Sequence, residues 1–150
     1  MRYSGARYLG LLIGATVMLS ACAGRSQQSS ITGSLAPTMT IERFLRAANQ
    51  NDLDTMAGLF GTRDGAVTRT WSRKEIDDRM FLFASLLRHS DYTVASEQIV
   101  PGRRDEATQF TVRMVLQHGP VPVPFTMVRT RNDQWLIEEI GIEAITHPNR

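Results

Sequence analysis

Apolar residues recur every three or four positions between residues 41 and 87, which is the spacing of a buried stripe on an α-helix. The pattern predicts three helices, with the stripes Ile41, Phe44, Leu45 and Ala48, then Leu53, Met56, Leu59 and Phe60, then Ile76, Met80, Phe83, Ala84 and Leu87. We expect Thr40, Asp52 and Ser72 to cap the three N-termini, because their side-chain oxygens accept bonds from unpaired backbone N–H groups. Glu75, three residues after Ser72, completes a capping box.

The segment between the second and third helices reads as a connection. Gly61 is expected to end the second helix as a left-handed residue, and residues 62–65 have the composition of a turn. No strand is evident there. The third helix is expected to run from Ser72 to about Arg88, which makes it the longest of the three.

After residue 91 the period of the apolar positions changes to two, the pattern of a strand with one buried face. The alternation predicts four strands, over 92–100, 110–117, 123–131 or 125–131, and 134–140, with turns at 101–104, 118–120 and 132–133. Pro122 and Pro124 lack an N–H on the same side of the third strand, so that side must be a sheet edge or a loop. Gly141 is expected to bend or bulge the fourth strand before Ile142–Ile145.

Helices followed by antiparallel strands predict an α+β fold in which three N-terminal helices pack on one face of a sheet of about four strands. The alternation assigns the inner face to Phe110, Val112, Met114, Leu116, Phe125, Met127, Trp135 and Ile137. The outer face is mostly polar, with Thr111, Arg113, Gln117, Thr126, Thr130 and Glu138, and it also carries Val115, Val128 and Leu136. An antiparallel sheet can leave such a face in water.

The first 22 residues have a different pattern. Arg2 and Arg7 precede an apolar run from Leu9 to Leu19, which is too short to cross a bilayer as a helix and is typical of a signal peptide. Leu19-Ser20-Ala21-Cys22 resembles the lipobox of bacterial lipoproteins. The resemblance implies cleavage between Ala21 and Cys22, attachment of diacylglycerol to the Cys22 thiol and acylation of the new amine, so that several acyl chains anchor the protein.

An ordinary secretory leader is the alternative, because Ala21-Cys22-Ala23 also fits a small-residue cleavage site. The chain has one cysteine, and its position in the box favours lipidation. Ala23 and Gly24, rather than an acidic residue, follow that cysteine, which resembles sorting to the outer membrane where the cell has one. The domain is then expected to face the periplasm or the exterior.

The sequence divides into residues 1–21 (signal peptide), 22–37 (the lipidated cysteine and a flexible tether) and 38–150 (one globular domain). Residues 23–37 are rich in Ser, Gln and Gly and too poor in apolar residues to fold. A flexible coil of that length spans about 20 Å, enough to hold a domain off a lipid surface. The remaining length suffices for a single domain.

Net charge gives no support for nucleic-acid binding. The chain has 17 Lys and Arg against 15 Asp and Glu. Removal of Arg2 and Arg7 with the signal peptide leaves 15 basic residues against 15 acidic ones, a net charge of zero. The predicted partners are therefore a membrane, reached through the lipid, and a small molecule or protein rather than DNA or RNA.

Residues 40–60 have the pattern of an amphipathic helix running into Asp-x-x-x-Met-x-x-Leu-Phe, and residues 132–137 read Asn-Asp-Gln-Trp-Leu-Ile. In these two segments the globular part resembles the nuclear-transport-factor-two-like (SnoaL-like, cystatin-related) superfamily. The resemblance implies a cone-like fold in which a curved sheet wraps a helix, often around a cavity. Some members are isomerases, cyclases or dehydratases, and enzyme members carry a short strand or hairpin before the long helix.

No residue matches the catalytic motifs of those enzymes, and we expect no catalytic site. Asp77 and Asp78 are adjacent on a helix and point about 100° apart, so they do not form a carboxylate pair. Asp91 and Tyr92 combine a base with a proton donor, but a Tyr at the start of a strand more often packs against the core. The alternative is an isomerase-like or lyase-like enzyme that uses an acidic or Tyr group in the cone.

Nothing in the sequence predicts a metal or a cofactor. His89, His118 and His147 lie in three separate segments without metal-ligand spacing, and His89 is expected near a helix C-terminus, where the dipole favours it. The chain has no Gly-rich phosphate loop. Trp71 and Trp135 are expected in the core or in the wall of a pocket.

Two interaction surfaces follow from the pattern. A small apolar ligand would bind between the third helix and the sheet, in a pocket formed by Phe83, Phe110, Met114, Phe125 and Trp135. A partner protein or a second copy of the chain would instead dock on the outer sheet face, which requires Val115, Val128 and Leu136 to form a contiguous apolar patch.

Overall fold

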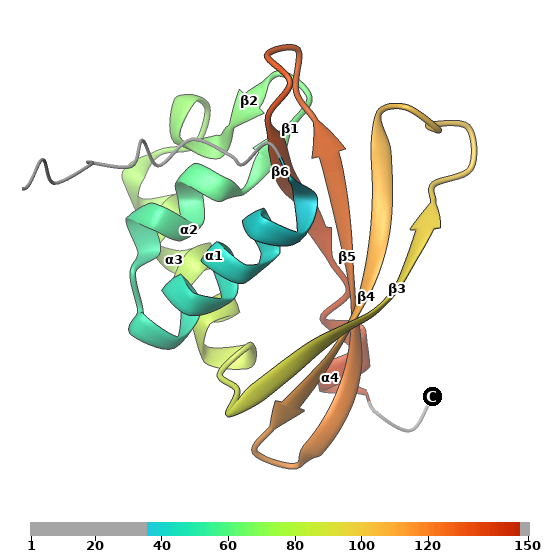
Figure 1. The fold of residues 1–150 in the computed structure, drawn as a ribbon. Helices are drawn as coiled ribbons and strands as arrows, with labels where there is room; N and C mark the ends of the chain where they lie inside the picture. Colours follow the sequence, from blue (N-terminus) through green and yellow to red (C-terminus); the bar gives the residue numbers. More distant parts are fainter. Residues whose placement is uncertain (1–35, 148–150) are drawn as a thin grey trace, which may run out of the picture.

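The computed structural model describes residues 36–147, which form two layers, with the helices on one face of a twisted antiparallel sheet (Figure 1). The elements follow in the order α1 (Pro37–Gln50), α2 (Leu53–Leu59), β1 (Gly61–Thr62), β2 (Gly65–Ala66), the 3-10 helix η1 (Val67–Arg69), α3 (Arg73–Leu86), β3 (Asp91–Ile99), β4 (Ala107–Leu116), β5 (Gly119–Arg129), β6 (Trp135–Ile140) and α4 (Glu143–Thr146). The predicted α+β fold class is confirmed. The predicted signal peptide, Ala21, Cys22 and tether residues 23–35 lie outside the described residues.

The four long strands form one antiparallel meander in the order β3-β4-β5-β6. The predicted third strand begins earlier than expected, because β5 already pairs with β4 at Gly119, whose positive φ of 115° closes the turn. Pro122 and Pro124 therefore lie inside a strand. They are tolerated there because β6 pairs with β5 only from Phe125 onward, so their side is an edge, as predicted.

Two of the three predicted N-caps are confirmed. The Asp52 side chain accepts a bond from the Thr55 N–H, and Ser72 and Glu75 form the complete capping box at the start of α3. Thr40 is not a cap. The helix α1 begins at Pro37 instead, because proline fits the first helical turn, where its missing N–H has no partner to bond.

A hairpin between α2 and α3 was not expected from the sequence. Gly61 does not end α2 as a left-handed residue; the C-cap is Phe60, in an extended conformation, and Gly61 lies in β1. Within the predicted turn at 62–65, residues 63–64 join β1 to β2, and Thr62 and Gly65 pair with each other. Phe60 forms a parallel bridge to Ile137 of β6, which places this hairpin against the sheet.

The chain after β6 also differs from the expectation. Gly141 ends the strand, and Ile142–Ile145 enter the one-turn helix α4 rather than a further stretch of strand. A Cβ on Gly141 would lie 2.3 Å from Cγ of Pro124. The absence of a side chain at 141 therefore allows the backbone to pass close to β5, where the Gly141 N–H donates to the Pro124 carbonyl at 2.8 Å.

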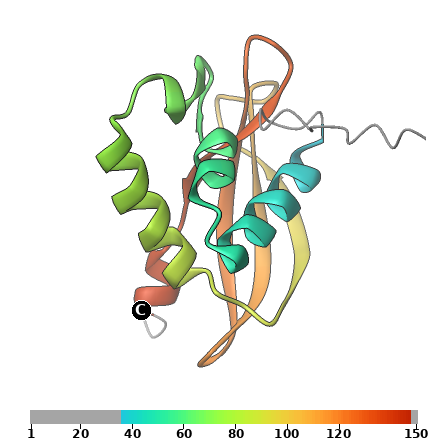
Figure 2. The same ribbon diagram turned by 90° about the vertical axis from the view of Figure 1, so that its left-hand side faces the viewer.

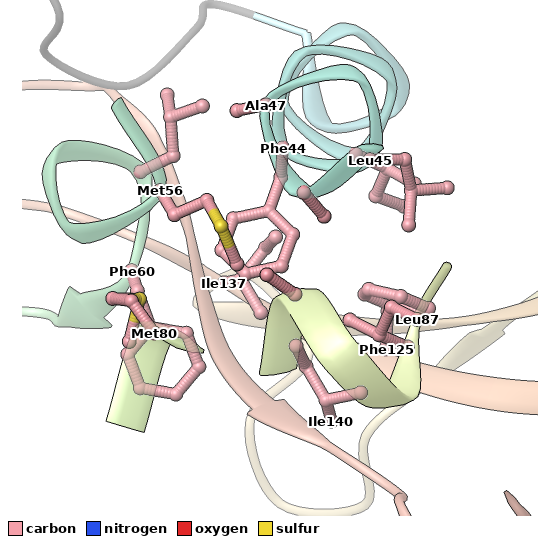
Figure 3. Close-up of a cluster of buried hydrophobic side chains, with 14 of the residues drawn as sticks. Phe44, Leu45, Ala47, Met56, Phe60, Met80, Leu87, Phe125, Ile137 and Ile140 are labelled. Atoms are coloured by element: carbon pink, nitrogen blue, oxygen red, sulfur yellow. The ribbon is translucent and has the colours of Figure 1, made fainter. Parts of the chain in front are cut away.

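The main core lies between the helices and the concave sheet face (Figures 2 and 3). Phe44 and Leu45 of α1, Met56 of α2 and Met80 of α3 meet Phe125 of β5 in this cluster, and all five are fully buried. The predicted inner sheet face is confirmed, since Phe110, Val112, Met114, Phe125, Met127 and Ile137 belong to this core and Leu116 and Trp135 pack against it.

The outer sheet face is partly covered. Val128 and Leu136 are buried with Ala66 of β2 in a second, small cluster, while Val115 is 36% exposed. The contiguous apolar patch that docking on this face requires is therefore not exposed as a whole, because Val128 and Leu136 are covered together with Ala66 of the β1–β2 hairpin.

Within residues 36–147, no helix has the length and hydropathy needed to span a membrane.

Candidate functional site

A cavity of about 180 Å³ opens between the β1–β2 hairpin, η1 and the start of α3. Its apolar lining comes from Phe60, Ala66, Val67 and Trp71. The hydroxyl-bearing residues Thr62 and Thr70 also line it, and both are exposed. The cavity is thus a small, mainly apolar recess with polar groups near solvent, the usual arrangement of a small-molecule site.

Aromatic side chains form the floor of this cavity, which we call the aromatic cavity. The ring centroid of Phe60 lies 5.9 Å from that of Trp71, 5.4 Å from that of Phe83 and 6.4 Å from that of Phe44. These tilted pairs lie within the range in which aromatic rings attract one another. The guanidinium carbon of Arg79 lies 4.5 Å from the Trp71 ring centroid and stacks on it. The floor is therefore held from several sides and is preformed.

Two glycines shape the wall. A Cβ on Gly61 would lie 2.3 Å from the Gly65 carbonyl oxygen, so any side chain at 61 would push the hairpin apart. Gly65 has a φ of 135°, a backbone conformation that L side chains rarely adopt. This wall therefore depends on glycine at both positions. The sequence pattern contained both glycines but assigned them to a helix end and a turn.

Charged groups surround the opening. The Asp64 carboxylate lies 2.9 Å from a guanidinium nitrogen of Arg131. Arg103 donates to both carboxylate oxygens of Glu138, at 2.6 and 3.1 Å, and this raises the pKa of Arg103. Asp64, Glu138 and Arg69 line the cavity, whereas Arg103 and Arg131 do not.

The five residues of the predicted ligand pocket lie elsewhere. Phe110, Met114 and Phe125 are at most 2% exposed in the main core, and Phe83 and Trp135 pack against that core. None of the five lines the cavity beside the hairpin, although Phe83 contacts its floor through Phe60. A ligand pocket formed by these five residues stays a prediction. Trp71, expected in the core or a pocket wall, lines the cavity.

A second recess, a polar groove of about 260 Å³, lies between the C-terminal half of α1 and the connection from α3 to β3. It is lined by Glu42, Arg46, Asn49, Gln50, His89 and Tyr92. Asn49 donates to the His89 carbonyl at 3.0 Å and accepts from the His89 N–H at 3.2 Å. This pair of bonds fastens the end of α1 to the connection.

The groove contains His89 and Tyr92, two of the side chains considered for chemistry. Nδ1 of His89 lies 2.8 Å from the Leu87 carbonyl oxygen, so Nδ1 carries the proton in the neutral ring and Nε2 is the acceptor. Burial, followed by the Glu42 carboxylate, raises the pKa of Tyr92, and Arg46 acts in the opposite direction. Tyr92 is therefore a protonated donor near neutral pH. This groove shares no lining residue with the aromatic cavity.

Asp77 and Asp78 are engaged in ion pairs on the surface of α3. Asp77 pairs with Arg73 at 3.0 Å, and Asp78 pairs with Lys74 at 2.6 Å. In each pair the partner lies one helical turn earlier. No group of three His, Cys, Asp or Glu side chains in residues 36–147 is placed to hold a metal ion.

The chain is similar to three solved structures. A protein of unknown function with a cystatin-like fold from Methylobium petroleophilum PM1 has 12% identity and a TM-score of 0.45, over 73% of this chain and 76% of that one. A chain named as a variant of Rd1NTF2_05 has 20% identity and a TM-score of 0.44, over 69% and 92%. A protein from Catenulispora acidiphila has 15% identity and a TM-score of 0.41, over 69% and 84%.

No family model matches this chain, and a search of curated proteins gave no match. Similarity to solved structures at this degree of identity carries no information on a ligand or an activity. Any function must therefore be argued from the residues of this chain.

Proposed function

We propose that this protein is a bacterial membrane lipoprotein, anchored through Cys22, whose α+β domain binds a small apolar ligand in the cavity beside Phe60 and Trp71. The aromatic floor of that cavity is the observation that carries the binding function. An engineered apolar cavity of about 150 Å³ holds benzene, so about 180 Å³ accommodates one six-membered ring. Burial of such a ring against two aromatic side chains supplies the driving force.

The anchor rests on the sequence. The charged start, the short apolar run and the single cysteine in the lipobox together support lipidation of Cys22, and Ala23 and Gly24 favour the outer membrane. The predicted tether, residues 23–37, ends where α1 begins, so a domain attached in this way stays within tens of ångströms of the lipid surface.

A fatty-acid labelling experiment tests the anchor. Cells that express the chain are grown with a labelled fatty acid, and we expect the natural protein to carry label and the Cys22→Ser variant to lack it and to keep its leader. The variant Cys22→Ser with Ser26→Cys is the matched control, because it keeps one thiol but moves it out of the lipobox. Equal labelling of the natural chain and Cys22→Ser would contradict the proposal.

Ligand binding is tested by fluorine NMR with fluorobenzene as the probe. We expect the probe signal to broaden and shift with added protein and this response to be lost in Thr70→Trp, because an indole at position 70 fills the recess. Thr68→Trp is the matched control, since Thr68 is an exposed threonine in the 3-10 helix η1, which Thr70 caps, and it does not line the cavity. Equal binding by both variants would refute this site.

A further inference from the structure

Two carboxylates and one guanidinium line the aromatic cavity, and they differ in whether they have an ion-pair partner. Both lining carboxylates are neutralised by arginines outside the lining, Asp64 by Arg131 and Glu138 by Arg103. Arg69 lines the same cavity, and its guanidinium forms no ion pair or hydrogen bond within residues 36–147. The cavity thus presents one unmatched positive charge to a ligand.

The position of Arg69 is set by the hairpin. Arg69 is the last residue of η1, and its side chain crosses Gly65, so that a Cβ there would lie 3.3 Å from Nη1 and 3.6 Å from Cδ. The glycine that closes the hairpin therefore also leaves room for the guanidinium beside the cavity. Trp71, two residues further along the chain, contributes the aromatic floor.

We propose that the ligand of this cavity is a small organic carboxylate, whose apolar body lies on Phe60 and Trp71 and whose carboxylate is bound by Arg69. This inference rests on the proposed binding function and specifies its ligand class. A guanidinium binds a carboxylate through two parallel charge-assisted hydrogen bonds, which are stronger than bonds between neutral groups. A ligand cation finds no free counter-charge here, because each lining carboxylate already has an arginine partner.

The test compares two probes of the same shape and different charge. Fluorobenzoate and fluorobenzamide are titrated separately into the purified full-length protein, and binding is followed by fluorine NMR. We expect fluorobenzoate to bind about tenfold more tightly than fluorobenzamide, as one charge-assisted contact at a solvent-exposed position provides. Arg69→Gln should remove this preference by lowering the affinity for fluorobenzoate to about that for fluorobenzamide.

Arg88→Gln is the matched control. Arg88 is also an exposed arginine, but it follows α3 and does not line the cavity, so the same substitution should leave the preference for fluorobenzoate intact. Because the Arg69 side chain has no partner within residues 36–147, we expect Arg69→Gln to fold normally, with an unchanged circular dichroism spectrum.

The possible results separate this inference from the function on which it rests. Equal affinity for both probes, or a preference for fluorobenzoate that survives Arg69→Gln, overturns the carboxylate inference and leaves the apolar cavity site standing. Failure of both probes and of fluorobenzene to bind overturns the cavity function, and this inference with it.

Discussion

Gly141→Ala tests whether the close approach between Gly141 and Pro124 of β5 leaves no room for a side chain at position 141. The added Cβ would lie 2.3 Å from Cγ and 2.9 Å from Cδ of Pro124, distances that require one of the two backbones or the proline ring to move. The ring is covalently closed, so it cannot rotate away as a flexible side chain can. Insertion of a methyl group into such a site costs about 1–3 kcal/mol.

When the proline ring is absent, Gly141→Ala should stabilise the protein rather than destabilise it. Gly141 does not adopt a positive φ, so alanine fits the backbone there. In a Pro124→Ala background the nearest remaining side-chain atom is Cβ, 3.6 Å away, which is ordinary contact. Gly141→Ala should then stabilise the protein by about 0.4–1 kcal/mol, because it lowers the entropy of the unfolded chain. The two positions should therefore couple by about 1.4–4 kcal/mol.

Urea unfolding of the natural chain, both single variants and the double variant, followed by far-ultraviolet circular dichroism, measures this coupling. The double-mutant cycle cancels the separate cost of losing the proline ring. If Gly141→Ala has the same effect in both backgrounds, the ring of Pro124 is not the obstacle and the reasoning is refuted.

Two further predictions concern stability. Thr40→Val should cost about 1–2 kcal/mol in urea unfolding, because the buried Thr40 hydroxyl donates to the Trp135 carbonyl at 3.1 Å and its loss leaves that acceptor without the bond, whereas the exposed control Thr68→Val should change little. Burial raises the pKa of Tyr92, so its contribution to stability is present below the unfolded value of about 10 and is lost as the pH rises through the folded pKa. Tyr92→Phe should weaken the alkaline loss of stability in a pH series; an unchanged slope above pH 10 would contradict this.

Local chemistry was enough to predict much of the fold. Asp52, Ser72 and Glu75 act through bonds to N–H groups at most three residues away, so their caps could be read from adjacent positions. The change of period from helical to alternating likewise marked where the sheet begins, and the apolar alternation selected its inner face, because a one-residue shift would expose every buried side chain.

The candidate site could not be predicted in the same way. Phe60, Val67 and Trp71 line a cavity only because a two-residue hairpin bonds back on itself, and Gly61 permits this by its distance from the Gly65 carbonyl rather than by any local helix-ending geometry. The role of Thr40 also depends on a distant residue, since its hydroxyl donates to a carbonyl 95 positions away.

The sequence by itself determined the order of α1, α2, α3 and the four long strands, the caps of α2 and α3 and the inner face of β4, β5 and β6, all of which depend on neighbours along the chain. Only the tertiary structure decided that Val128 and Leu136 are covered, that Arg69 lacks a counter-charge within residues 36–147 while nearby carboxylates have theirs, and where a cavity lies. These features arise from segments that meet in space, and contact between distant segments leaves no periodic signal in the order of residues.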